Sequence, residues 1–331
     1  MKTLIFKSSK LIKPLITILI IFLILALAIF PDKYSKSTYE GLVLWAVAVL
    51  PSLLPYFFLT AVLTKLNVLS NFSNKCTPLT NKTFHLNGCA VYAFLMSVLS
   101  GYPVGSKITL DLYEKNVIDK NQCLTMGLLC STSGPLFIIG AVGTGMFLSK
   151  TAGYILYVSH VLSALINAFI FRGKRKNCFI NDNYLSSQKS DNLLYDCVYS
   201  SVISALIVGG FVSVFYVISE IFLDLKILYP LTALIKLILL PFNVAPTDCL
   251  SFSVGLIEFT KGAKLLSEAG ANSMSLSLTC FLITFGGASA IMQSLAFLKK
   301  AKVKTGAFIL GKFTQGLIAS VICFILCSAL L

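Results

Sequence analysis

The chain has 331 residues, of which 56% are hydrophobic and 12% are charged, and its mean hydropathy is +0.86. A soluble domain usually carries about 25% charged residues, so this composition excludes a soluble globular protein and predicts an all-α polytopic membrane protein. The net charge of +14 lies at the edges of apolar segments, which is the positive-inside pattern of membrane proteins and excludes a nucleic-acid-binding surface.

The N-terminal segment, residues 1–38, predicts a first transmembrane helix. Lysines at positions 2, 7, 10 and 13 precede the apolar run "LITILIIFLILALAIF" at 15–30. Ala26-Leu27-Ala28 resembles a signal-peptide cleavage site, but Ile29 and Phe30 continue the apolar run. We therefore expect an uncleaved helix whose N-terminus lies inside.

The next apolar run, "GLVLWAVAVLPSLLPYFFLTAVL" at 41–63, exceeds the roughly 20 residues that a bilayer crossing requires. Residues 65–100 and, later, 223–254 are apolar but interrupted by prolines. Such segments are compatible with re-entrant hairpins or with short amphipathic helices at the membrane interface, and the sequence leaves both open.

Residues 100–107, "SGYPVGSK", resemble a phosphate-binding loop but lack the Walker A spacing. Pro103 between Gly101 and Gly105 instead predicts a break, after which a helix restarts near Ser106 and runs to about residue 115. Ser106 is a candidate N-cap, and the free N–H groups with Lys107 would form an anion site. The alternative is a proline kink with Lys107 reaching the interface.

A second break is predicted in "CSTSGPLFIIGAVG" at 130–143, where three hydroxyl residues precede Gly134-Pro135. Its counterpart is "TFGGASAIMQ" at 284–293. Polar, glycine-rich breaks at matching positions of two halves indicate a substrate site near the bilayer midplane. Packing of helices through small residues is the alternative, and both can hold. The candidate substrate-binding residues of these two breaks are Ser131, Thr132, Ser133, Gly286, Gly287, Ser289 and Gln293.

Four pairs of segments in the same order indicate an internal duplication. Residues 38–63 resemble 194–219, 101–116 resemble 255–270, 130–142 resemble 284–296, and Gly153 matches Gly306. We therefore predict repeat 1 at 39–171, a cytoplasmic-side polar linker at 172–193, and repeat 2 at 194–331.

Charge predicts that the two repeats are inverted. The loop before the last helix of repeat 2 is "KKAKVK" at 299–304, whereas its counterpart in repeat 1, "SKT" at 149–151, has one lysine. The same loop is therefore expected inside in one copy and outside in the other, as in many secondary transporters. Each half then makes an odd number of crossings, and the C-terminus lies outside.

Among the charges within apolar segments, we rank the repeat-related pair Lys107 and Lys261 above Asp111, Glu114 and Glu258 as candidate substrate ligands. No metal, cofactor or enzymatic activity is expected. The ten cysteines lack metal-ligand spacing, the two histidines His85 and His160 lie far apart, and no catalytic pair of acidic residues or H-E-x-x-H helix occurs.

The motifs "SGYPVGSKITLDLYEKN" (100–116), "SGPLFIIGAVGTGMF" (133–147) and "FGGASAIMQ" (285–293) resemble the YlbJ (SpoVV) family of sporulation integral membrane proteins. The likeness runs from about residue 40 to the end. The resemblance implies gate-type domains similar to those of concentrative nucleoside transporters. It also implies transport of dipicolinic acid across the outer forespore membrane of a sporulating bacterium.

A small aromatic dicarboxylate suits the predicted breaks, because hydroxyls, lysines and helix N-termini bind carboxylates and the Tyr102 ring can face a pyridine. We expect this anion and membrane lipid, but no nucleic acid, as partners, and a homo-oligomer is left open. The competing hypothesis is a membrane scaffold or assembly factor of the spore envelope, which would call for larger polar domains than residues 172–193.

Overall fold

The computed structural model describes residues 2–66, 70–173 and 192–331, and no strand occurs among them. Five helical segments are long and apolar enough to cross a membrane: Pro31–Leu63, Lys150–Ile170, Leu193–Asp224, Ser273–Leu298 and Thr305–Leu330. The prediction of an all-α polytopic membrane protein is thereby confirmed. The apolar part of the first helix, Lys13–Ile29, has 17 residues, which is at the lower limit for a span.

The helices follow one another as α1 (Lys2–Ile29), α2 (Pro31–Leu44), η1 (Trp45–Val49), α3 (Leu50–Lys65), α4 (Ser70–Thr83), α5 (Cys89–Ser100), α6 (Val104–Glu114), α7 (Lys120–Leu129), η2 (Leu136–Met146), α8 (Lys150–Ile170), α9 (Leu193–Asp224), α10 (Tyr229–Leu239), η3 (Leu240–Phe242), α11 (Pro246–Gly255), α12 (Phe259–Ser267), α13 (Ser273–Phe285), α14 (Gly287–Leu298) and α15 (Thr305–Leu330). Of these, η1 and η2 are π-helices and η3 is a 3₁₀ helix. Most predicted linker residues, 174–191, lie outside the described residues.

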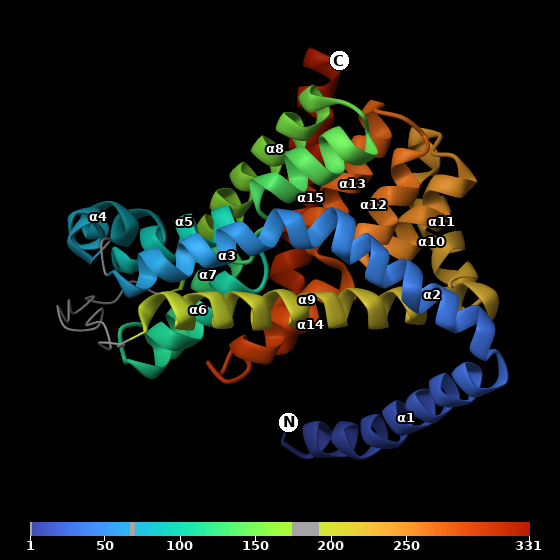
Figure 1. The fold of residues 1–331 in the computed structure, drawn as a ribbon, viewed down its shortest axis with the longest axis horizontal. Helices are drawn as coiled ribbons and strands as arrows, with labels where there is room; N and C mark the ends of the chain where they lie inside the picture. Colours follow the sequence, from blue (N-terminus) through green and yellow to red (C-terminus); the bar gives the residue numbers. More distant parts are fainter. Residues whose placement is uncertain (1, 67–69, 174–191) are drawn as a thin grey trace.

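Two long helical rods lie antiparallel along the molecule (Figure 1). The first is the continuous run α2–η1–α3 and the second is α9. Ion pairs join both ends, Lys33 with Asp224 at 2.7 Å and Lys65 with Asp196 at 3.7 Å. At mid-length the indole of Trp45 packs on Gly209, where a Cβ atom would lie 2.6 Å from a ring carbon. The glycine is therefore what lets the two rods approach so closely.

A second layer packs on this pair. Helices α8, α13 and α15 contact one another, and η2 packs on α8, so these four elements form a bundle above the rods in Figure 1. Helix α1 lies apart from this bundle and contacts α2 and α9, where Ala26 joins a buried cluster with Tyr34 and Ile221.

The two halves have the same order of elements. The first contains a long rod, α4, α5, a break, α6, α7, a second break, η2 and α8, and the second contains α9, α10, α11, a break, α12, α13, a second break, α14 and α15. The duplication, with its bounds at 39–171 and 194–331, stays a prediction. The two rods, each of which opens one half, are antiparallel, as inverted repeats require. The inversion of the whole halves stays a prediction.

The segments that the sequence left open form short helices. Helices α10 and α11 have 11 and 10 residues and pack on each other, and α4 and α5 have 14 and 12 residues and also pack on each other. Each is shorter than the roughly 20 residues of a crossing. These helices therefore do not span a bilayer singly, which fits both re-entrant hairpins and short helices at the membrane interface.

Candidate functional site

The helix breaks of both halves meet around a central cavity of about 30 Å³ between the two long rods. Its lining residues are Gly101, Tyr102, Ser133, Gly134 and Phe137 from the first half, Phe259, Thr260, Ala290 and Gln293 from the second, and Val49, Leu53, Val208 and Val212 from the rods. A water molecule needs about 10–15 Å³ of such space, so the cavity has room for roughly two waters in this conformation.

Tyr102 is placed by the first break. Helix α5 ends at Ser100, Gly101 has φ +83°, the Tyr102–Pro103 peptide is cis, and α6 begins at Val104. The positive φ explains the glycine, because other residues rarely adopt it. The Tyr102 hydroxyl donates to the carbonyl of Thr284 at 3.1 Å, so this break is tied to the second half.

The prediction that Ser106 caps the new helix is wrong. Pro103 occupies the N-cap position, and Ser106 lies inside α6, where its hydroxyl is 3.3 Å from that of Ser131. The helix begins at Val104, directly after the proline, so Ser106 is already its third residue. Gly105 also lies inside α6, where an added Cβ would collide with the Cys130 carbonyl.

The predicted hydroxyl residues of the second break are all buried, and each has a distinct environment. Ser133 lines the cavity, and its N–H donates to Nε2 of His160 at 2.9 Å. Thr132 contacts the Ser97 hydroxyl at 2.5 Å. Because Nε2 of His160 accepts from Ser133, its Nδ1 carries the proton toward Thr284, 2.9 Å away.

In the second half, α13 ends at Phe285 and is followed by Gly286, which has φ +90°. The first N–H groups of α14 bind the other break of this half: Ala288 donates to Leu256 and Ser289 to Ile257, at 2.8 and 3.1 Å. They are therefore not free to bind an anion. Gln293 lines the cavity, and its Oε1 has no hydrogen-bond partner among the residues that the structure describes.

The structure does not bring the two predicted lysines together. Lys261 is buried, pairs with the Glu220 carboxylate, donates to the Ser219 hydroxyl at 2.9 Å and lies over the Tyr216 ring. Lys107 is exposed and lines a different cavity. The N-terminus of α12 is capped by Glu258, whose carboxylate accepts from the Lys261 N–H at 2.7 Å. This helix end is thus already capped by a carboxylate of the chain itself.

Sequence reasoning missed Lys312 of α15. The side chain is fully buried, and Nζ donates to the Tyr102 hydroxyl at 2.8 Å, the Ser131 carbonyl at 2.8 Å and Gln315 Oε1 at 2.9 Å. It joins both breaks of the first half to the last helix. The sequence did contain an indication, because Lys312 lies within the apolar run 306–331. A charged side chain within a membrane span is energetically costly and usually functional.

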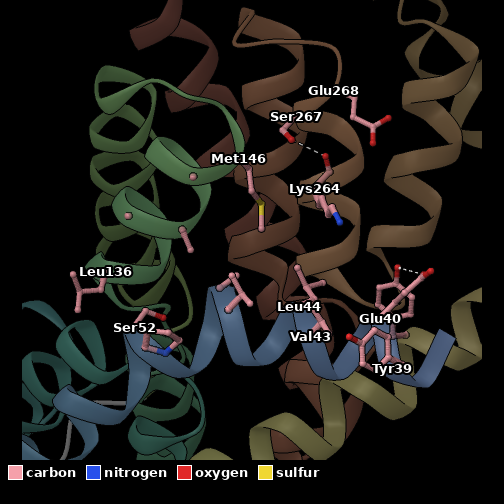
Figure 2. A pocket seen from close by; sticks show the side chains of 17 residues that line it. Tyr39, Glu40, Val43, Leu44, Ser52, Leu136, Met146, Lys264, Ser267 and Glu268 are labelled. Atoms are coloured by element: carbon pink, nitrogen blue, oxygen red, sulfur yellow. Dashed lines mark hydrogen bonds between the residues drawn. The ribbon is translucent and has the colours of Figure 1, made fainter. Parts of the chain in front are cut away.

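Two larger cavities flank the central one. A cleft of about 910 Å³ lies between α2, η1, η2 and α12, with Glu40, Lys264 and Glu268 among its lining residues (Figure 2). A cavity of about 360 Å³ lies between α3, α6 and the start of α9, with Lys65, Lys107 and Asp111. Both π-helices, η1 and η2, line the larger cleft, and such helices are frequent at functional sites.

The three cavities follow one another along both rods. On α2–η1–α3 the lining residues fall at 39–52, then 49–53, then 57–65. On α9 the corresponding positions are 216, then 208–212, then 196–204. The cavities therefore lie in a row parallel to two membrane-spanning helices. In the described part of the chain, no group of three or more His, Cys, Asp or Glu side chains could hold a metal.

The chain is 26% identical over 340 aligned residues to the sporulation integral membrane protein YlbJ of Bacillus subtilis strain 168. The alignment covers 96% of this chain and 83% of that protein. This similarity supports assignment of the chain to the YlbJ family. No family model and no solved structure matches the chain. Like that YlbJ relative, the chain is an integral membrane protein, and the comparison supports a role in sporulation.

Proposed function

We propose that this YlbJ-like protein is a secondary transporter or facilitator that moves dipicolinate, a small aromatic dicarboxylate, across the outer forespore membrane. The family resemblance supplies the substrate and the membrane. The observation that carries the transport proposal is the row of three cavities along two antiparallel spanning helices, because such a row offers a route from one side of the membrane to the other.

The middle of this route is closed by aromatic side chains. The ring centroid of Phe259 lies 5.7 Å from that of Phe137 and 6.5 Å from that of Tyr102. These rings come from both halves and surround a cavity with room for about two waters. Passage of a substrate then requires the halves to move, which is the alternating access expected of transporters with a central site.

The asymmetry of the flanking cavities supports the same mechanism. The cleft beside Glu40 and Glu268 is wide, whereas the cavity beside Lys65 and Lys107 is narrower. A conformation in which the second cavity widens and the first narrows would expose the centre to the other side. The breaks supply the flexible points that such a motion needs.

The test is uptake of labelled dipicolinate by liposomes that contain the purified protein. We expect uptake above that of protein-free liposomes, and loss of most of it in Gln293→Leu, which removes the unpartnered amide from the cavity. Absence of uptake by folded protein would contradict the transporter proposal and favour a scaffold. Uptake by Gln293→Leu equal to that of the wild type would show that the substrate does not pass through the central cavity.

A further inference from the structure

Three charged side chains are buried in the described part of the chain: Glu258, Lys261 and Lys312. Lys261 pairs with Glu220, and Glu258 accepts from the Lys261 N–H and from the Ser289 hydroxyl. Lys312 differs, because the described residues place no carboxylate within ion-pair distance of its Nζ. Its charge is therefore without a direct counter-ion.

The hydrogen bonds of Lys312 match the donors of an ammonium group. The Ser131 carbonyl and Gln315 Oε1 can only accept, and the Tyr102 hydroxyl uses its proton on the Thr284 carbonyl, so its oxygen also accepts from Nζ. Three acceptors around one nitrogen need three N–H donors, which –NH₃⁺ has and a neutral amine lacks. The three neutral partners satisfy the donors but leave the positive charge in place.

This charge lies directly behind the wall of the central cavity. Nζ is 5.2 Å from the centroid of the Tyr102 ring, and Tyr102 lines the cavity. A charge in an interior with little water is screened less than a charge at the surface, so it still acts on an ion in the cavity over such a distance. Gln293, on the cavity wall, adds an amide whose oxygen is unpartnered.

We propose that Lys312 makes the central cavity selective for anions by supplying the positive charge that attracts a carboxylate group of the passing substrate. Lys312 acts through space, behind Tyr102, and not as a direct ligand in this conformation. The proposal rests on the proposed transport function and deepens it. It also gives a role to a buried charge that has no counter-ion in the last helix, where such a charge is costly.

Lys261 provides the internal comparison. It occupies the equivalent of Lys107 and is buried like Lys312, but Glu220 neutralises it and the Tyr216 ring covers it. The positive charge of Lys261 is therefore balanced by the adjacent Glu220 carboxylate. The two buried lysines therefore have different electrostatic effects on the route, and the uncompensated one is the one next to Tyr102.

The test introduces a counter-ion with minimal change of shape. Gln315→Glu replaces the amide oxygen that accepts from Lys312 at 2.9 Å by a carboxylate oxygen, while Lys312→Met removes the charge itself. Lys300→Met, at an exposed position, is the matched control. Each variant is reconstituted in liposomes and offered labelled dipicolinate, which is pyridine-2,6-dicarboxylate, or its neutral isostere pyridine-2,6-dicarboxamide. Thermal unfolding of each variant is measured in parallel.

We expect Gln315→Glu to unfold at or above the wild-type temperature and to lose at least roughly tenfold in dicarboxylate uptake, which corresponds to about 1.4 kcal/mol, with dicarboxamide uptake unchanged or raised. Lys312→Met should lose dicarboxylate uptake in the same way, and Lys300→Met should behave as wild type. A purely structural Lys312 predicts instead that Gln315→Glu is stable and transports normally.

Retention of dicarboxylate uptake by either folded variant overturns the proposal. If neither variant yields folded protein, uptake of the two compounds by the wild type is the test. Equal uptake of the dicarboxylate and the dicarboxamide overturns anion selectivity, and a preference for the dicarboxylate supports it. Failure of the wild type to take up the dicarboxylate at all contradicts the transport function itself, which is a separate outcome.

Discussion

At the scale of single residues, Tyr102 is the side chain on which most contacts of the centre depend. Its hydroxyl accepts from Lys312 and donates to the Thr284 carbonyl, and its ring lines the central cavity. One residue thus connects a break of the first half with α13 and α15 of the second. The sequence indicated Tyr102 as an aromatic side chain beside a helix break. It did not indicate the partners Thr284 and Lys312, because both lie about 180 residues or more further along the chain.

Tyr102→Phe should lower the stability of the folded protein. The change leaves the Thr284 carbonyl and one donor of the Lys312 ammonium without a partner, and a buried polar group without a partner costs about 1–3 kcal/mol. Thermal unfolding in detergent measures the effect. The control is Tyr154→Phe, at a side chain that is 58% exposed, which should unfold as the wild type does. Equal unfolding of Tyr102→Phe and wild type would contradict this contact network.

Gly105 is important for packing rather than for breaking the helix. Its Cα faces the Cys130 carbonyl so closely that an added Cβ would overlap it, and the obstacle is backbone, which cannot swing aside. We therefore expect Gly105→Ala to separate α6 from the second break and to destabilise the protein by about 1–3 kcal/mol or more. Thermal unfolding checks this, and an unchanged unfolding temperature would contradict the close approach.

At the scale of helices, the antiparallel pair of α2–η1–α3 with α9 forms the frame along which the three cavities lie. Hydropathy alone locates these rods, because each is an apolar run longer than a bilayer crossing requires. Their antiparallel pairing and their register depend on where small residues of one face large residues of the other. Gly209 opposite Trp45 and Gly41 opposite Tyr216 set that register.

Two neighbouring glycines of α9 test this register. A Cβ at Gly209 would lie 2.6 Å from the Trp45 ring, whereas a Cβ at Gly210 would meet nothing within 4 Å. We expect Gly209→Ala to cost about 1–3 kcal/mol by overpacking. Gly210→Ala should be neutral or stabilise by up to about 1 kcal/mol through helix propensity. Equal unfolding temperatures of the two variants would contradict the packing of Trp45 on α9.

At the scale of the whole molecule, the two flanking cavities occupy equivalent places in the two halves. The wide cleft involves α12 with the start of the first rod, and the narrower cavity involves α6 with the start of α9. Because the rods are antiparallel, these places lie at opposite ends of the molecule. With the orientation that the charge pattern predicts, the wide cleft faces the outside, where Tyr39 lies, and the narrow cavity faces the inside, where α9 begins at Leu193.

Thiol labelling from one side of the membrane tests this arrangement. A membrane-impermeant thiol reagent added outside should label Ser267→Cys, at the wide cleft, and not Ser200→Cys, at the narrow cavity. Added from inside, it should label Ser200→Cys alone. The unsubstituted chain provides the background. Labelling of both positions from the same side would contradict the inverted arrangement of the halves.

The sequence by itself determined that this chain is an all-α membrane protein and where its helices break, because apolar run length, proline and glycine act locally. The equivalence of Lys107 and Lys261 was also a local inference, and tertiary structure separated them: α9 covers Lys261, while Lys107 stays exposed. The tertiary structure alone decided that the breaks surround one cavity and that Lys312 of α15 lies behind it. Which face of a helix meets a distant break depends on how helices cross, and no local pattern encodes that crossing.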